Sequence, residues 1–131
     1  MSMRDTPLWT WHVAAGLVIL ILLGLHMGIM HLSGVLHLDS LNPAGDGPLD
    51  WANVAWRART VFFTQSYIVL LGAGLFHGLY GLKNILFELG PSRGLGSAIN
   101  AVLLLLGVGL FALGTWAAVT ARTVALAASS M

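Results

Sequence analysis

The sequence predicts an all-α membrane protein with three transmembrane helices. Hydrophobic residues make up 57% of the chain and charged residues only 8%, whereas soluble domains carry about 25% charged residues. Three windows, 6–38, 60–82 and 94–121, contain no charged side chain. Each window exceeds the ~20 residues that a helix needs to cross the hydrocarbon core, so we expect one helix in each.

The first transmembrane helix is expected at about residues 8–34. Trp9 and Trp11 near its start are typical of the aromatic belt at a membrane surface. Its apolar stretch is longer than that of a signal peptide, and no small-residue cleavage site precedes the charged loop, so we expect this helix to be retained. The loop that follows is rich in Pro and Gly and reaches Asp50.

The rest of the chain is predicted to contain one interfacial segment and two further spans. Trp51, Trp56 and two arginines suit a short helix or turn that lies in the membrane interface. Gly90 and Pro91 provide a helix stop before the last span. All elements belong to one membrane-anchor domain over residues 1–131, with the interfacial segment at about 50–59, the second span at about 61–89 and the third at about 97–122.

Composition also excludes several kinds of function. The chain has no cysteine, which excludes disulfides and iron–sulfur ligation by this chain. It has no phosphate loop, no nucleophile constellation and no basic patch for nucleic acid. Large apolar faces and few charges predict a subunit of a larger assembly within the lipid bilayer. Basic residues do not fix its orientation, because they are shared equally between the two sides: Arg4, Lys83 and Arg93 against Arg57, Arg59 and Arg122.

His77 is the most informative residue, because it lies in the middle of the second span. An imidazole at this depth is costly and normally has a partner, and haem iron is the natural metal between helices. Residues 3, 4, 7 and 11 positions away share its helix face. That face carries small residues and most of the polar groups of the helix: Ser66, Leu70, Ala73, Gly74, Gly81, Asn84 and Glu88. Glu88 is expected ~16 Å from His77 along the axis, at the membrane surface.

A simpler interpretation of His77 is a hydrogen bond to a carbonyl or hydroxyl group of a neighbouring helix. Gly74 and Gly78 can likewise serve a small-xxx-small helix contact, which is compatible with haem binding. The third span contains no histidine, and we expect its glycines to be packing positions: Gly107, Gly109 and Gly114.

Further histidines occur on the first span. His26 is the deepest, so it is the candidate for a second buried ligand, with a packing histidine as the alternative. His31 lies roughly 140° round the helix from His26, so the two cannot ligate one metal. His31 and His37 are shallower and are expected at the interface. His12 lies near the opposite surface, where contact with a quinone headgroup or a haem propionate competes with plain solvation, the simpler interpretation.

These motifs together resemble the small membrane-anchor subunits of succinate:quinone oxidoreductases (succinate dehydrogenase, or respiratory complex II). The similarity covers about residues 9–89. In the first span it rests on His26-Met27-Gly28-Ile29-Met30-His31. In the second it rests on Trp-Ala-Asn-Val-Ala-Trp-Arg-Ala-Arg, then His77-Gly78-Leu79-Tyr80-Gly81-Leu82, the Ile85-Leu86 pair, and an acid, Glu88, eleven residues after the histidine.

The resemblance implies a non-catalytic subunit of an oxidoreductase complex of the tricarboxylic acid cycle. Such an anchor forms half of a multi-subunit helical bundle with a second hydrophobic anchor subunit and docks an iron–sulfur subunit and a flavoprotein subunit that oxidise succinate. Electrons then reach a quinone, with one or two haem b groups nearby that are shared with the partner subunit. The family pattern makes His77 an axial ligand of haem iron and gives the second haem to His26, with His31 as the fallback. It also implies a bacterial or archaeal plasma membrane and a cytoplasmic N-terminus.

One departure from the family concerns the quinone. The family's acid is usually Asp followed by a Tyr that helps to hold the quinone, whereas Glu88 is followed here by Leu89. The candidates for the quinone site are therefore Glu88, Tyr80, Lys83 and His12, and those for the haem surroundings are Ser66, Gly74 and Gly81. Two alternatives use the same chain: a cytochrome b-type anchor of another quinone-linked dehydrogenase, such as a formate or hydrogenase system, and a haem-free structural anchor.

Overall fold

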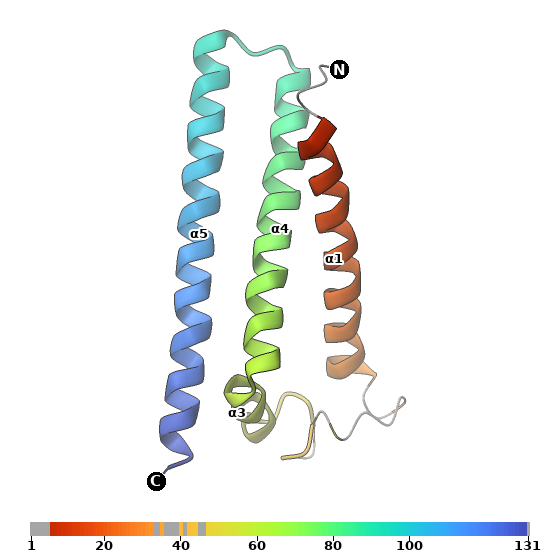
Figure 1. Ribbon diagram of the computed structural model, residues 1–131, viewed down its shortest axis with the longest axis vertical. Coiled ribbons are helices and arrows are strands. Elements are labelled where there is room, and N and C mark those ends of the chain that lie inside the picture. Colours follow the sequence, from red (N-terminus) through yellow and green to blue (C-terminus); the bar gives the residue numbers. More distant parts are fainter. Residues whose placement is uncertain (1–5, 33–34, 36–39, 41, 45–46, 131) are drawn as a thin grey trace.

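The computed structural model describes residues 6–32, 35, 40, 42–44 and 47–130, and every regular element among them is helical (Figure 1). This confirms the prediction of an all-α protein. The helices are α1 (Thr6–His31), α3 (Trp51–Arg59), α4 (Val61–Glu88) and α5 (Arg93–Ala128).

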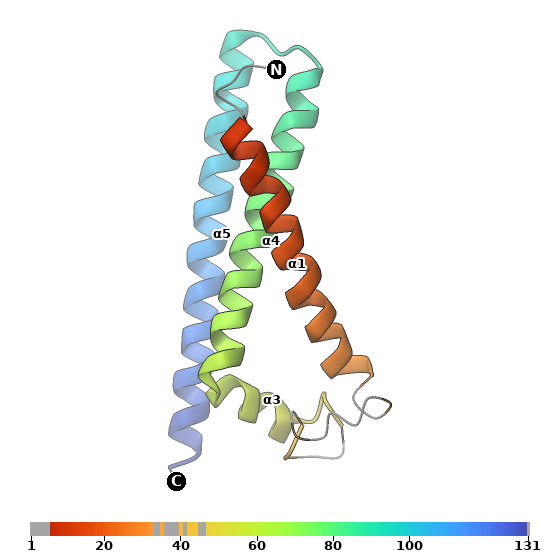
Figure 2. The same cartoon turned by 45° about the vertical axis from the view of Figure 1, so that its right-hand side comes forward.

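The three long helices lie side by side, with α4 between α1 and α5 and each antiparallel to its neighbour (Figure 1). Turned by 45°, α1 is seen to lean across α4 and to diverge from it toward the end where α3 lies (Figure 2). The α4–α5 turn and the start of α1 therefore share one end of the molecule. The C-terminal end of α5 and the short helix α3 share the other end.

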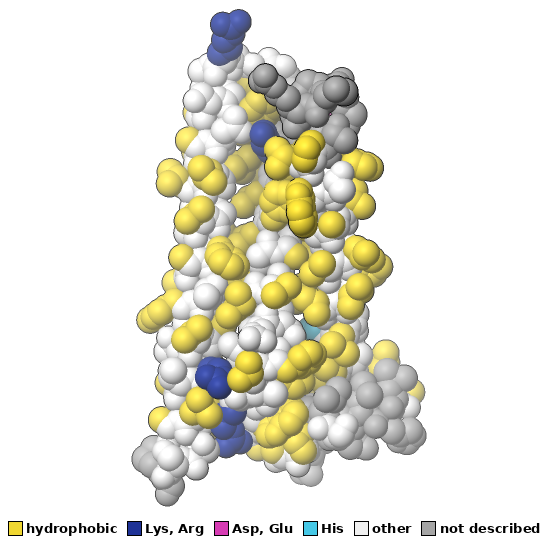
Figure 3. Space-filling model, viewed as in Figure 1, with side chains coloured by type: hydrophobic (Ala, Val, Ile, Leu, Met, Phe, Trp, Pro, Cys, Tyr) yellow, Lys and Arg dark blue, Asp and Glu magenta, His cyan; other side chains and the backbone are white. Residues whose placement is uncertain are grey.

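All three long helices are long and apolar enough to cross a membrane. Their hydrophobic side chains cover the visible face along its length, whereas Lys and Arg lie toward its two ends (Figure 3). Among the described residues, Ile29 and Phe63 are the buried hydrophobic side chains. Most apolar surface thus faces outward, as expected of an integral membrane protein with three apolar helices.

The helix ends differ modestly from those expected. The first span ends at His31 rather than residue 34, and the second ends at Glu88. Gly90 follows with a φ of 64° and its N–H donates to the carbonyl of Phe87 (3.1 Å), which is the predicted glycine stop. The third span is longer at both ends, over 93–128. The Ser92 hydroxyl accepts a bond from Leu95 N (3.4 Å) and begins the helix early, and an alanine-rich sequence continues it past residue 122.

Glycines on α5 allow it to pack closely on α4. A Cβ placed on Gly107 would lie 3.0 Å from the side chain of Leu79, and one on Gly114 would meet Leu71. These two positions confirm the packing prediction. At Gly109 an added Cβ would meet no described atom within 4 Å, so a packing role for this glycine stays a prediction. Two residues correspond to about 200° of helix, so Gly109 faces away from the α4 contact that Gly107 makes.

The predicted interfacial segment is the helix α3, which runs across one end of the bundle (Figure 2). Its buried side is polar, because Asn53 and Arg57 point to the preceding loop. Asn53 is fully buried and bonds Ala44 N and Gly47 O, each at 2.8 Å. Arg57 donates to the side-chain oxygen of Asn42 (2.6 Å) and to the carbonyl of Pro48. These bonds fasten the described part of the loop to α3.

Candidate functional site

His77 projects from α4 toward α1 and meets its backbone. Its Nδ1 lies 3.0 Å from the carbonyl oxygen of His12. A carbonyl oxygen only accepts hydrogen bonds, so this contact requires the proton on Nδ1 and leaves the lone pair on Nε2. No described residue bonds Nε2. A histidine oriented by a backbone carbonyl through one nitrogen is prepared to ligate a metal through the other.

The close approach of His77 to α1 depends on Gly16, which our sequence analysis missed. A Cβ at this position would lie 3.1 Å from Cε1 and 3.2 Å from Nδ1 of His77. Gly16 is one helical turn after His12, so both residues occupy the same side of α1. The spacing of a histidine and a glycine was visible in the sequence. Which side of α1 would meet α4 was not.

His12 is half-buried and packs on α4, which the simpler interpretation of the sequence, plain solvation, did not predict. Its ring stacks on that of His77, with centroids 4.0 Å apart and planes 9° from parallel. The ring of Tyr80 lies 5.2 Å away on the same helix as His77. The His12 Nδ1 is buried without a hydrogen-bond partner among the described residues. Gly81 makes room for this ring, because its added Cβ would lie 3.5 Å from Cε1 of His12.

A hollow of about 820 Å³ opens between the start of α1 and the end of α4. Its lining includes three predicted quinone-site residues, Tyr80, Lys83 and Glu88. The ring of Tyr80 also contacts that of His12, the fourth predicted residue. Lys83 Nζ lies 5.6 Å from the ring centre of Phe87. The volume falls within the range of small-molecule sites in proteins. The lining is completed by Leu8, Trp9, Asn84 and Phe87.

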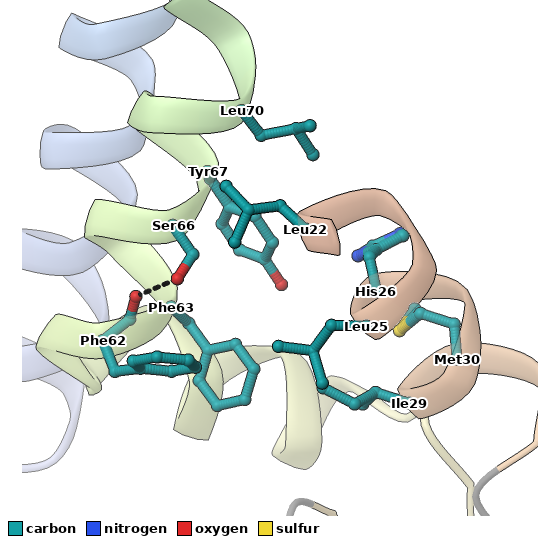
Figure 4. Close-up of a pocket in the computed structure, with 10 residues that line it drawn as sticks. All are labelled: Leu22, Leu25, His26, Ile29, Met30, Phe62, Phe63, Ser66, Tyr67 and Leu70. Atoms are coloured by element: carbon teal, nitrogen blue, oxygen red, sulfur yellow. Dashed lines mark hydrogen bonds between the residues drawn. The ribbon is translucent and has the colours of Figure 1, made fainter. Parts of the chain in front are cut away.

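His26 faces a different space, a narrow cavity between α1 and α4 (Figure 4). The cavity measures about 20 Å³, which is room for about one water molecule. Its lining includes Ser66, whose hydroxyl donates to Phe62 O (2.7 Å), and Tyr67, whose ring is edge-on to His26 at 6.0 Å. A tetrapyrrole cannot fit here, so a haem on His26 has to approach from outside the α1–α4 contact.

The remaining predicted residues are separated from these spaces. Gly74 and Gly78 are exposed, and a Cβ on either would meet no described atom within 4 Å, so the chain itself does not use them for helix packing. His31 is exposed at the end of α1. His37 lies outside the described residues.

Within the described part of the chain, no group of three or more His, Cys, Asp or Glu side chains converges as a metal site. The parallel rings of His12 and His77 do not point their nitrogens at a common centre. A metal on His77 would therefore need further ligands from outside the described residues.

In comparisons with known proteins, no family model, curated protein or solved structure matches the chain. The family resemblance therefore rests on the sequence motifs alone.

Proposed function

We propose that this chain is the membrane-anchor subunit of a succinate dehydrogenase-type complex, in which it binds haem b and helps to form the quinone site. One juxtaposition supports the proposal best. His77 is oriented through Nδ1, and one turn further along α4 begins a hollow that contains Tyr80, Lys83 and Glu88. The proposed haem ligand, His77, and the proposed quinone pocket are thus adjacent along α4.

In this proposal His77 would hold the haem through Nε2, the nitrogen that no described residue bonds. The backbone carbonyl of His12 fixes the imidazole tautomer and increases the basicity of Nε2, as carbonyl groups bonded to metal-binding histidines do. The open surface at Gly74 and Gly78 allows a flat group or a partner helix to approach the backbone. A bound haem would supply one-electron transfer. His77 would hold the haem together with a residue of the second anchor subunit, and His26, or His31 as the fallback, is the candidate to hold a second haem.

The hollow supplies what quinone reduction requires of the protein. Reduction of a quinone to a quinol consumes two electrons and two protons, so the site needs groups that donate hydrogen bonds and exchange protons. The Tyr80 hydroxyl and the Lys83 ammonium can donate to the quinone carbonyls, and Glu88 can pass protons inward from the surface. Leu8 and Trp9 offer an apolar wall for the ring.

The partners follow from this assignment. An iron–sulfur subunit and a flavoprotein subunit are expected to dock at the end that holds the hollow, since the electrons have to reach the quinone there. With a cytoplasmic N-terminus, that end faces the cytoplasm of a bacterium or archaeon. A cytochrome b-type anchor of another quinone-linked dehydrogenase uses the same residues.

The haem-free structural anchor is a second candidate with an observation in its favour. The bond from His77 to the His12 carbonyl already satisfies one imidazole nitrogen inside the chain. A histidine of this kind can serve helix packing alone.

A reduced absorption spectrum of the purified complex tests the proposal. We expect His77→Ala to remove the b-type absorption of one haem, whereas His12→Ala should keep it, because the backbone carbonyl that holds Nδ1 remains. Unchanged b-type bands in His77→Ala would exclude the ligand assignment, and a fully assembled wild-type complex without haem would establish the structural anchor. Mass spectrometry of the co-purifying subunits separates the enzymes, since a flavoprotein with covalent FAD indicates the succinate dehydrogenase type.

A further inference from the structure

An apolar groove between α1 and α4 borders the polar hollow that contains Lys83 and Glu88. It measures about 380 Å³, and only apolar and aromatic side chains line it: Leu8, Trp11, Ala14, Ala15, Val18 and Phe76. Leu8 also lines the hollow, so the two spaces are neighbours at the start of α1. The groove then follows α1 from Leu8 to Val18, away from the end of the molecule that holds the hollow.

Helical spacing places the α4 side of the groove in line with the hollow. Phe76 precedes Tyr80, Lys83 and Phe87 by 4, 7 and 11 residues, so the four side chains share one face of α4. The rings of Phe76 and Tyr80 stack, with centroids 5.7 Å apart and planes 22° from parallel. Lys83 lies ~10 Å further along the axis than Phe76. This face of α4 therefore changes from aromatic within the span to polar at its end.

The chemistry of the two spaces suits one amphipathic ligand with a neutral, flat headgroup. The lining of the hollow holds one cation and one acid, Lys83 and Glu88, so it offers no net charge to a phosphate group. Phe76 and Tyr80 present aromatic rings where the hollow and the groove meet, and such rings pack well on another flat ring. The groove accepts an apolar chain, because none of its lining residues is charged.

We propose that the groove binds the isoprenoid tail of the quinone whose ring occupies the hollow. This inference rests on the proposed function, since it assigns the second part of the same ligand. The tail passes Phe76 and lies on Ala14 and Ala15, whose small side chains leave the space. Lipid is as apolar as the groove, so the tail gains close packing contacts rather than hydrophobic burial. Trp11 and Phe76 are 67% and 36% exposed, which leaves the groove open for entry from the membrane.

A quinone that carries a photoreactive diazirine on its tail tests the inference in the purified complex. After illumination, mass spectrometry identifies the labelled residues. We expect labels on Phe76 and on the groove residues of α1. An excess of a tailless quinone should remove these labels, because its ring competes for the hollow. Ala14→Leu should reduce them at least about fivefold, since the larger side chain overfills the groove. Ala112→Leu, the same change at an exposed alanine of α5, should leave them unaltered.

The possible failures are distinct. Labels that the tailless quinone removes but that lie elsewhere would overturn the inference and leave the quinone site in place. Labels in the groove that it does not remove would also overturn the inference, because the groove would then hold apolar chains of any kind. A complex without any removable label would reject the quinone site itself, and the inference with it.

A second variant keeps the test decisive if Ala14→Leu does not assemble. Phe76→Ala removes one wall of the groove without adding bulk, so it should also reduce the labels on α1. Wild-type labelling of α1 in an assembled Phe76→Ala complex would overturn the inference.

Discussion

Gly16 determines how closely His77 can approach α1. An added Cβ would lie 3.1 Å from the imidazole, which is tighter than ordinary van der Waals contact. The imidazole also stacks on the ring of His12 and bonds the backbone carbonyl of His12, so it has little freedom to move aside. A side chain at this position has to push the two helices apart or displace the ring.

We therefore expect Gly16→Leu to destabilise the chain by about 1–3 kcal/mol, the usual cost of overpacking a contact. Gly24→Leu is the matched control, because Gly24 lies on the same helix and its added Cβ would meet no described atom within 4 Å. The free energy of unfolding, measured by denaturant titration of helicity in detergent, distinguishes the two. Equal losses in both variants would show that α1 does not pack on His77 through Gly16.

The short helix α3 stabilises the loop before it through buried polar bonds rather than apolar packing. Asn53 is completely buried and uses both ends of its amide on the backbone of the loop. Arg57, one turn later, binds two further loop oxygens. Loss of either residue leaves buried polar groups without partners, which costs more than the net value of the hydrogen bonds themselves.

Asn53→Ala should therefore loosen the loop. We expect amide hydrogen exchange in residues 42–50 to become at least about tenfold faster, since each unsatisfied buried group costs about 1–3 kcal/mol. Asn100→Ala, an exposed asparagine on α5, is the control and should leave these rates unchanged. Exchange in Asn53→Ala within twofold of the wild type would contradict the assigned bonds.

The molecule as a whole exposes most of its apolar side chains, because its three long helices form a single layer with α4 in the middle. Such a layer has almost no core of its own among the described residues. The arrangement fixes which segments share a membrane side. The α4–α5 turn lies with the start of α1, and the loop before α3 lies with the end of α5.

Sided thiol labelling tests this arrangement, and the chain suits it because it has no cysteine. Leu89→Cys and Leu49→Cys introduce thiols at positions that are 79% and 74% exposed. We expect an impermeant maleimide to label one of them in intact vesicles and the other only after permeabilisation, since one span separates them. Labelling of both under the same condition would contradict the topology. The residue that labels in inside-out vesicles also reveals which end is cytoplasmic.

Much of the fold could be predicted from the sequence, because transmembrane helices are determined by long apolar windows and by local stop signals. The absence of charge over 60–82 and the Gly90 turn defined α4 within a residue. The N-cap bond of Ser92 and the alanines after Arg122 lengthened α5 beyond the expected ends, since capping and helix propensity act where the hydrophobic pattern is weak. Helical periodicity also predicted that Glu88 lies near the end of that span, on the face of His77.

The sequence by itself determined the membrane-spanning helices, the depth of His77 and the separation between that histidine and Glu88, because these depend on composition and on the constant rise of a helix. Only the tertiary structure decided that His77 faces α1, that His12 stacks on it and that His26 borders a space too small for a haem. The sides of two helices that meet depend on their relative rotation and crossing. Helix rotation and crossing are set by packing between segments that are distant in the chain. The residue pattern of one helix carries no information on that packing.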